Sequence, residues 1–147
     1  MPGRNLPEFV RPRGMANVLR ALQHNAGSTP DKAAVTGSLV SLTWRELHDE
    51  VLAVSAALQD CETLGLFMEN SPAWVVADLS AIHAGVINIP LPGFFSDEQI
   101  QHAVQDASID TVITDNPGRM RLLFPGGRES GLEIAGKLYT QIFFSVE

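Results

Sequence analysis

Helix-start signals alternate with short apolar runs through the middle of this chain, and that rhythm constrains its fold more than any other feature. Two capping boxes, Thr43–Glu46 and Ser96–Gln99, each place a hydroxyl and a Glu or Gln side chain three residues apart, which satisfies free amides in a helix's first turn. Ser71-Pro72 adds a third start, a serine N-cap followed by proline at the first helical position. Apolar runs of strand length lie between and after these helices, at 63–68, 86–91 and 109–114, and the last is closed by Asn116-Pro117-Gly118.

Strand, helix and strand repeated at this spacing predict βαβ units, because a parallel neighbour is reached only through a crossover connection. We therefore expect an α/β fold with a mostly parallel, Rossmann-like sheet and helices on both faces. Gly85 is placed to end the middle helix. The apolar positions of the three helices are Trp44, Leu47, Val51, Val54 and Leu58; Val75, Leu79 and Ile82; and Ile100, Ala103, Val104 and Ala107.

The two ends of the chain depart from this rhythm. Residues 1–14 carry three prolines and two glycines, which predicts an irregular N-terminal arm. A helix is expected from Met15 to about Asn25, with Gly27 as its stop. A short N-terminal and a C-terminal hairpin are also expected: Ala33–Thr36 with Leu39–Leu42 around Gly37-Ser38, and Leu132–Ala135 with Leu138–Phe144 around Gly136-Lys137.

Composition excludes several classes of partner. With a formal net charge of −7, the chain lacks the basic face that nucleic-acid phosphates require, so we expect no nucleic-acid partner. No apolar stretch is long enough to cross a bilayer, and the N-terminus has no secretory signal core. The single cysteine, Cys61, forms no intramolecular disulfide and fits a reducing compartment, so we expect a cytoplasmic protein. At 147 residues the chain has the length of one domain.

More specific information comes from a series of short patterns. They are the opening segment Thr29–Val35, the helix start Leu42–Leu47, the turn Met68–Trp74, the crossover Ala81–Leu91, and the segment Ser96–Ile100 with the strand Ile109–Asp115. Each pattern alone is a generic cap, turn or strand. Together and in this order they resemble the N-terminal part of the AMP-forming acyl- and aryl-CoA ligases, the adenylate-forming (AMP-binding) superfamily. The resemblance fades after Pro117.

The resemblance implies a two-step reaction in a larger parent protein. A carboxylic acid attacks the α-phosphate of Mg-ATP, and a thiol, usually of coenzyme A, then takes the acyl group, so ATP, Mg²⁺ and coenzyme A are implied for that parent. The family handles ATP with a Ser/Thr/Gly-rich loop ending in Pro-Lys, a Thr-Glu motif, a ribose-binding Asp and a C-terminal lysine, and we find none of these motifs here.

The resemblance therefore implies that residues 15–147 form a structural N-terminal subdomain of an AMP-dependent acyl- or aryl-CoA ligase, with the remainder of that ligase as its partner. We expect no catalytic, cofactor-binding or metal-binding residue within the chain and no activity from it alone.

Two segments imitate phosphate loops. Gly27–Lys32 has one glycine and coincides with the family's opening segment, so no nucleotide contact is expected from it. Gly131–Lys137 has Walker spacing, but Leu138 stands where Mg²⁺ needs a Ser or Thr, which favours a hairpin turn.

The histidines and one serine favour structural interpretations. Ser80 and His83 share one helix face, but no strained elbow presents the serine, so we expect helix packing rather than a nucleophile. The histidines fall one per expected helix, without zinc-ligand spacing: His24, His48, His83 and His102.

Cys61 and the two tryptophans are interpreted in the same way. Cys61 lies between Asp60 and Glu62, whose negative charges should raise the pKa of the thiol and keep it unreactive. Trp44 and Trp74 each begin a helix and are expected to anchor the core rather than to bind substrate.

Two alternatives to a ligase subdomain stay open at this point. A free-standing interaction or regulatory module would keep the fold without the chemistry and would show a polar surface where the ligase has an interface. A flavodoxin-like signalling domain would need an acidic cluster at the strand ends, where only Asp115 lies.

Phe94-Phe95 is the most exposed aromatic pair expected, and it either packs on the rest of the parent protein or borders a substrate entrance. Ile142–Phe144 is expected to form a sticky strand edge that promotes self-association.

Overall fold

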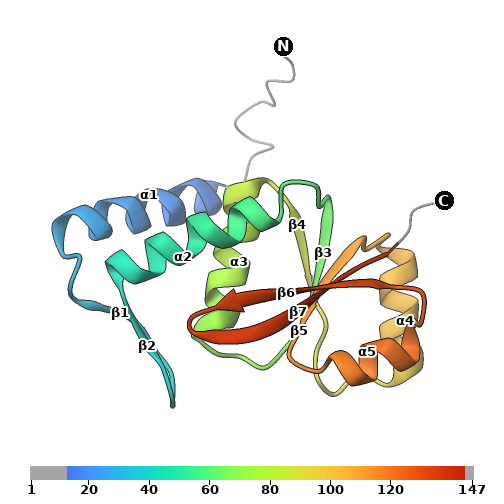
Figure 1. Ribbon diagram of the computed structural model, residues 1–147. Helices are drawn as coiled ribbons and strands as arrows, with labels where there is room; N and C mark the ends of the chain where they lie inside the picture. The colour runs from blue at the N-terminus through green and yellow to red at the C-terminus, as the bar shows by residue number, and fades with distance from the viewer. Residues whose placement is uncertain (1–12, 145–147) are drawn as a thin grey trace, which may run out of the picture.

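The computed structural model describes residues 13–144, which form one sheet with flanking helices and a small separate hairpin (Figure 1). In chain order the elements are α1 (Arg13–Ser28), β1 (Ala33–Thr36), β2 (Ser41–Thr43), α2 (Trp44–Ala57), β3 (Thr63–Phe67), α3 (Pro72–Ala84), β4 (Ile87–Pro90), α4 (Asp97–Asp106), β5 (Thr111–Thr114), α5 (Pro117–Leu123), β6 (Arg128–Ile134) and β7 (Lys137–Phe143).

The main sheet has the strand order β4-β3-β5-β7-β6. β3 pairs in parallel with β4 and β5, whereas β7 pairs antiparallel with β5 and β6. The α/β fold class is confirmed, and the C-terminal hairpin extends the parallel strands into one mixed sheet. From β3 the chain crosses to β4 on one side and then to β5 on the other. Because such crossovers are right-handed, α3 and α4 fall on opposite faces.

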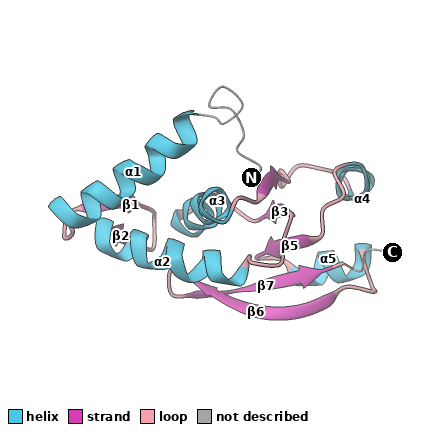
Figure 2. Ribbon diagram, turned by 90° about the horizontal axis from the view of Figure 1, so that it is seen from above, coloured by secondary structure: helices cyan, strands magenta, loops and turns pink. Residues whose placement is uncertain are grey.

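Figure 2 shows the sheet between two helical layers, with α1, α2 and α3 on one face and α4 and α5 on the other. Alternate strand residues enter the two layers. Leu64, Leu66 and Ile113 belong to the core under α2 and α3. Val112 and Ile142 belong to the core under α4 and α5. The period-two alternation thus divides the hydrophobic interior into two clusters on either side of one sheet.

The helix starts follow the sequence signals closely. Both capping boxes form: Glu46 N donates to Thr43 Oγ1 at 3.2 Å, and Gln99 N donates to Ser96 Oγ at 3.1 Å, with reciprocal side-chain contacts. Trp74 N donates to Ser71 Oγ at 3.2 Å, and α3 ends at Gly85 in the left-handed conformation with φ of 73°. The expected stripe of α2 is buried except for Trp44, which is half-buried.

The N-terminal region differs from expectation in three places. The expected arm over 1–14 lies outside the described residues apart from Arg13 and Gly14, which belong to α1. The helix also runs through Gly27 to Ser28, so the predicted stop is wrong, since a helical glycine costs only about 1 kcal/mol. β1 and β2 form the expected antiparallel hairpin, but its loop spans residues 37–40 rather than two residues. Gly37 is needed there for space, because a Cβ would lie 2.6 Å from Pro72 Cδ.

The C-terminal region contains a helix that the sequence analysis missed. Asn116-Pro117-Gly118 does not simply close β5: the Asn116 side chain caps α5, and proline occupies its first turn. The β6–β7 hairpin is confirmed, although Ala135 and Gly136 form its turn, with φ of 53° and 83°. Two consecutive residues with positive φ fit the twist of a tight hairpin.

The expected sticky edge at Ile142–Phe144 is wrong. β7 lies inside the sheet between β5 and β6, and Ile142 is buried. The true edges are β4, where Pro90 offers no amide, and β6, whose exposed residues include Arg128 and Glu129. None of the helices described over 13–144 has the length and hydrophobicity of a membrane span.

Candidate functional site

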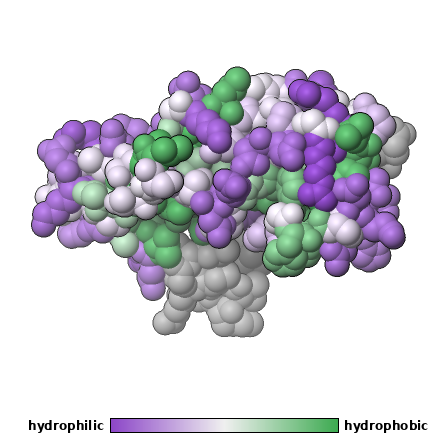
Figure 3. Space-filling model, turned by 90° about the horizontal axis from the view of Figure 1, so that it is seen from below, coloured by the Kyte–Doolittle hydropathy of each residue, from purple (hydrophilic) through white to green (hydrophobic). Residues whose placement is uncertain are grey.

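A cleft of about 700 Å³ lies where the parallel strands β4, β3 and β5 end, at the lower edge of the molecule in Figure 1. The chain leaves β3 toward one face of the sheet and leaves β5 toward the other, so the connections diverge at this edge. In open α/β sheets, ligands bind at such a divergence. Figure 3 views this side, where apolar (green) and hydrophilic (purple) surfaces lie close together. This carboxyl-edge cleft is the candidate site.

The cleft has an apolar wall and a polar rim. Side chains of Leu66, Met68 and Trp74 contribute to the wall, while Glu69 and Asp115 lie on the rim. Glu69 N donates to Asp115 Oδ2 at 3.0 Å, which ties the loop after β3 to the end of β5. Asp115, the one acidic residue expected at a strand end, therefore lies at the cleft, where it links the loop after β3 to the end of β5.

Arg119 is the cation that lines the cleft in the described part of the chain. Asn116 positions it at the start of α5, since Asn116 Oδ1 accepts from Arg119 N at 3.3 Å. The Arg119 guanidinium already has partners: Nη2 lies 2.8 Å from Asp97 Oδ1 and donates to Phe95 O at 2.9 Å. It also stacks over the Phe67 ring, 5.2 Å from the centroid. Two carboxylates and one paired guanidinium leave the cleft without excess positive charge.

The opposite, amino edge of the parallel strands is closed by hydrogen bonds to Asp110. Its Oδ2 accepts from Glu62 N at 2.9 Å and Thr63 N at 3.0 Å, and its Oδ1 accepts from Thr111 Oγ1 at 2.8 Å. Partial burial opposes ionisation, but the donors outweigh it and hold the pKa of Asp110 below its ordinary value. This carboxylate joins β3 to β5, and it also borders an open hollow of about 460 Å³, smaller than the cleft, together with Glu62 and Arg128.

Cys61 lies beside this clamp. Burial raises the pKa of the Cys61 thiol to about 12, and the carboxylates of Asp110 and Glu62 add to the rise, while a contact with Thr111 lowers it. The expected direction is confirmed. Desolvation is the main cause, however, and the carboxylates that contribute are those of Asp110, which precedes β5, and Glu62, rather than that of Asp60.

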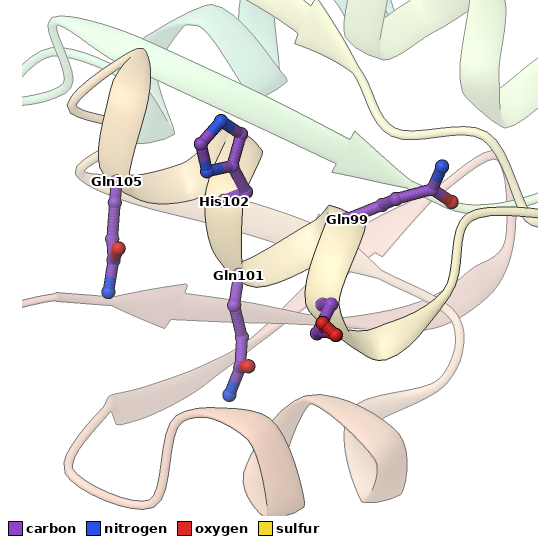
Figure 4. A pocket seen from close by; sticks show the side chains of 5 residues that line it. Gln99, Gln101, His102 and Gln105 are labelled. Atoms are coloured by element: carbon purple, nitrogen blue, oxygen red, sulfur yellow. The ribbon is translucent and has the colours of Figure 1, made fainter.

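A second hollow lies over α4 and offers no site. Figure 4 shows that Gln101 and Gln105 extend from the helix in one direction while His102 and Gln99 extend in others, so the side chains do not converge. Gln101 Nε2 donates to Leu123 O at 3.3 Å, and His102 pairs with Asp106 at 2.8 Å. This is the exposed face of a surface helix, with its polar groups already engaged locally.

The remaining sequence candidates are dispersed. Ser80 is fully buried and its hydroxyl donates to Val76 O at 2.6 Å and Val51 O at 3.2 Å, so it joins α3 to α2, which confirms the helix-packing interpretation. His83 is exposed, and the two side chains do not share a face. The histidines occupy separate helices, and no cluster of three or more potential metal ligands occurs among the described residues.

The two segments that imitate phosphate loops have other roles. In Gly27–Lys32, Thr29 N donates to Asn25 O at 2.8 Å and Lys32 N donates to Thr29 O at 3.2 Å, so the amides close a turn after α1. Gly131–Lys137 forms β6 and the hairpin turn, where Ala135 N donates to Glu50 Oε1 at 2.7 Å. The Glu50 carboxylate already occupies this amide and its negative charge would repel a phosphate. The hairpin interpretation is confirmed.

Arg119 and Asp110 were not predicted from the sequence. Arg119 follows the Asn116-Pro117 helix start by one turn, so recognising that cap would have placed it beside the strand end. Asp110 precedes a strand by one residue, and no local pattern shows that it accepts amides from residues 47 and 48 positions away. Of the expected aromatic pair, Phe94 is exposed at the cleft rim, whereas Phe95 packs into the core.

Comparison with known proteins agrees with this architecture. A family model described as AMP-binding enzyme matches residues 22–137. Tyrocidine synthase 3 of Brevibacillus parabrevis is 26% identical over 111 residues, covering 72% of this chain. Long-chain-fatty-acid–CoA ligase 6 of Rattus norvegicus is 29% identical over 79 residues, covering 50% of this chain.

A solved structure shows the same fold. The Vibrio cholerae adenylation domain AlmE, in complex with glycyl-adenosine-5'-phosphate, superimposes with a TM-score of 0.66 at 21% identity over 84% of this chain. The chain spans 24% of AlmE, 11% of the fatty-acid ligase and 2% of the tyrocidine synthase. The matching family model, which extends over most of the described residues, and this shared fold show that the chain belongs to the AMP-binding enzyme family, as an N-terminal subdomain of its adenylate-forming architecture.

Proposed function

We propose that the chain is the structural N-terminal subdomain of an AMP-dependent acyl- or aryl-CoA ligase, and that other parts of that protein supply the ATP-binding and catalytic groups. Its direct role is to present the carboxyl-edge cleft to the rest of the enzyme. The remainder of the ligase is its partner, and a reducing, cytoplasmic setting suits the single, half-buried thiol of Cys61.

The charge of the cleft is the observation that carries this proposal. A triphosphate requires several positively charged or N–H donors directed at one place. The cleft instead presents Glu69 and Asp115, and its Arg119 is engaged by Asp97. The residues present therefore do not fit Mg-ATP, and no chemical step is assigned to them.

A fatty-acid–CoA ligase among the relatives supports coenzyme A as the acceptor. The tyrocidine synthase supports the broader class of adenylate-forming enzymes. An assay of thioester formation by the full-length gene product distinguishes the two possible acceptors. Coenzyme A and carrier proteins are supplied in separate reactions. A product formed only on a carrier protein would overturn the coenzyme A assignment.

The test of the structural role is pyrophosphate exchange by the purified 147-residue chain with a panel of aliphatic, aromatic and amino acids. We expect no exchange above the protein-free rate and no saturable ATP binding by calorimetry. Exchange with any acid would show that the chain carries its own catalytic groups and would overturn the proposal.

A second candidate is a free-standing interaction module derived from this fold. The outer strand β6 favours it, because residues 128–131 of that strand are exposed and Arg121 from α5 pairs with Glu129 through two bonds of 2.6 and 2.8 Å. An immunoblot of source cells distinguishes the two. A band several times heavier than 15.9 kDa supports the ligase, and a band near that mass supports the module.

A further inference from the structure

The loop between β4 and α4 carries an exposed aromatic side chain directly beside the cleft. Phe94 is 86% exposed, yet it also lines the cleft rim. A turn presents it, since Phe95 N donates to Pro92 O at 3.0 Å. A Cβ added at Gly93 would meet no other atom within 4 Å, so the space beside this turn is open. An aromatic ring next to an apolar wall would gain from covering it.

Arg119 contacts this loop and the helix that follows it. Its Nε donates to Asp97 Oδ1 at 3.0 Å, and its Nη2 reaches the same oxygen and Phe95 O. The guanidinium also packs over Phe67 of β3. One side chain from α5 thereby connects the loop, the start of α4 and the sheet. The Phe94 ring meets the Phe95 ring edge-on, with the ring centroids 5.6 Å apart.

We propose that Arg119 is a latch that holds the Phe94 loop off the cleft, and that releasing the latch lets Phe94 fold onto the apolar wall near Trp74. Arg119 thus acts as a positioning residue through the loop. The relevance of an open cleft to catalysis rests on the proposed function, whereas the latch is a property of this chain alone.

Arg121 provides a matched control on the same helix. It pairs with Glu129 through two hydrogen bonds of 2.6 and 2.8 Å and is not among the residues lining the cleft. Replacing either arginine with glutamine removes one cation and one ion pair from α5. Only Arg119→Gln also removes the contacts to Phe95 and Asp97.

Trp74 reports on the cleft. In a Trp44→Phe background Trp74 is the single tryptophan, and acrylamide quenching of its fluorescence measures its access to solvent. We expect Arg119→Gln to lower the quenching constant about twofold, because Phe94 then covers the indole ring. Asp97→Asn removes the carboxylate that pairs with Arg119 and should also lower the quenching constant. Arg121→Gln should leave the quenching constant unchanged.

A rescue variant identifies Phe94 as the covering group. Adding Phe94→Ser to Arg119→Gln should return the quenching constant to that of the parent chain. Equal quenching in Arg119→Gln, Asp97→Asn and Arg121→Gln would overturn the latch, and so would failure of Phe94→Ser to restore it. No ATP, acid or thiol is used, so loss of the ligase proposal leaves this test intact.

Discussion

The two edges of the parallel strands differ in how their polar groups are used. At the amino edge, Asp110 accepts two amides and a hydroxyl, and Cys61 lies half-buried beside it. At the carboxyl edge, Asp115 accepts a single amide and borders a cleft of about 700 Å³. The amino edge is thus committed to stability, and the carboxyl edge keeps groups available for a ligand or another part of the enzyme.

The largest expected effect contrasts thiol reactivity at the two edges. With a pKa of about 12 in place of 9.0, Cys61 holds roughly a thousandfold less thiolate at pH 8 than an ordinary thiol. We expect a disulfide reagent to modify it far more slowly than an ordinary thiol, because the reactive thiolate is scarce. Asn70→Cys in a Cys61→Ser background places a thiol at the exposed carboxyl edge and should react at the rate of a free cysteine. Equal rates would show that the amino edge is open.

The next effect is on stability. Asp110→Ala removes three hydrogen bonds to a carboxylate and should lower the free energy of unfolding by about 2–3 kcal/mol. Asp115→Ala removes one and should cost about 1 kcal/mol. Urea denaturation followed by circular dichroism measures both. An equal loss of unfolding free energy in Asp115→Ala and Asp110→Ala would contradict the difference between the two edges.

The contribution of Asp110 should depend on pH in a definite direction. Its folded-state pKa lies below the ordinary value of 3.8, so the charged form is favoured in the native state. The stabilisation is therefore complete above the unfolded-state pKa and is lost as the pH falls through the folded-state pKa. The stability difference between the parent chain and Asp110→Asn should shrink as the pH falls from above 3.8 through the lower, folded-state pKa. A difference that stays constant over that range would mean that the carboxylate charge is not what stabilises β3 against β5.

Local signals predicted most of this fold because caps, turns and alternation act over a few residues. The boxes at Thr43 and Ser96 and the glycine stop at Gly85 formed as expected. Errors arose where distant packing decided the outcome. Gly27 stays helical within α1, and Ile142 and Phe143 lie inside the sheet because β6 pairs along the outer side of β7.

The cleft was harder to predict than the fold, since its residues come from separate loops. Asp115 was recognised at a strand end, but Glu69 and Arg119 reach it only through the topology of the sheet. Arg119 meets Asp97 across 22 positions of sequence. A single sequence carries no local mark of such a contact.

Self-association should be the weakest effect, and the edge comparison predicts where it arises. Phe94 at the carboxyl edge is 86% exposed, whereas Ile87 at the amino end of β4 is 61% exposed and is smaller. Burying one such ring in a symmetric contact supports only a weak dimer, with a dissociation constant on the order of millimolar. Sedimentation equilibrium at rising concentration should show a mass increase that Phe94→Ser reduces more than Ile87→Ser does. A constant monomer mass would refute the association. A larger effect of Ile87→Ser would place the contact at the amino edge, because the apolar surface of that edge would then contribute more to association than Phe94 does.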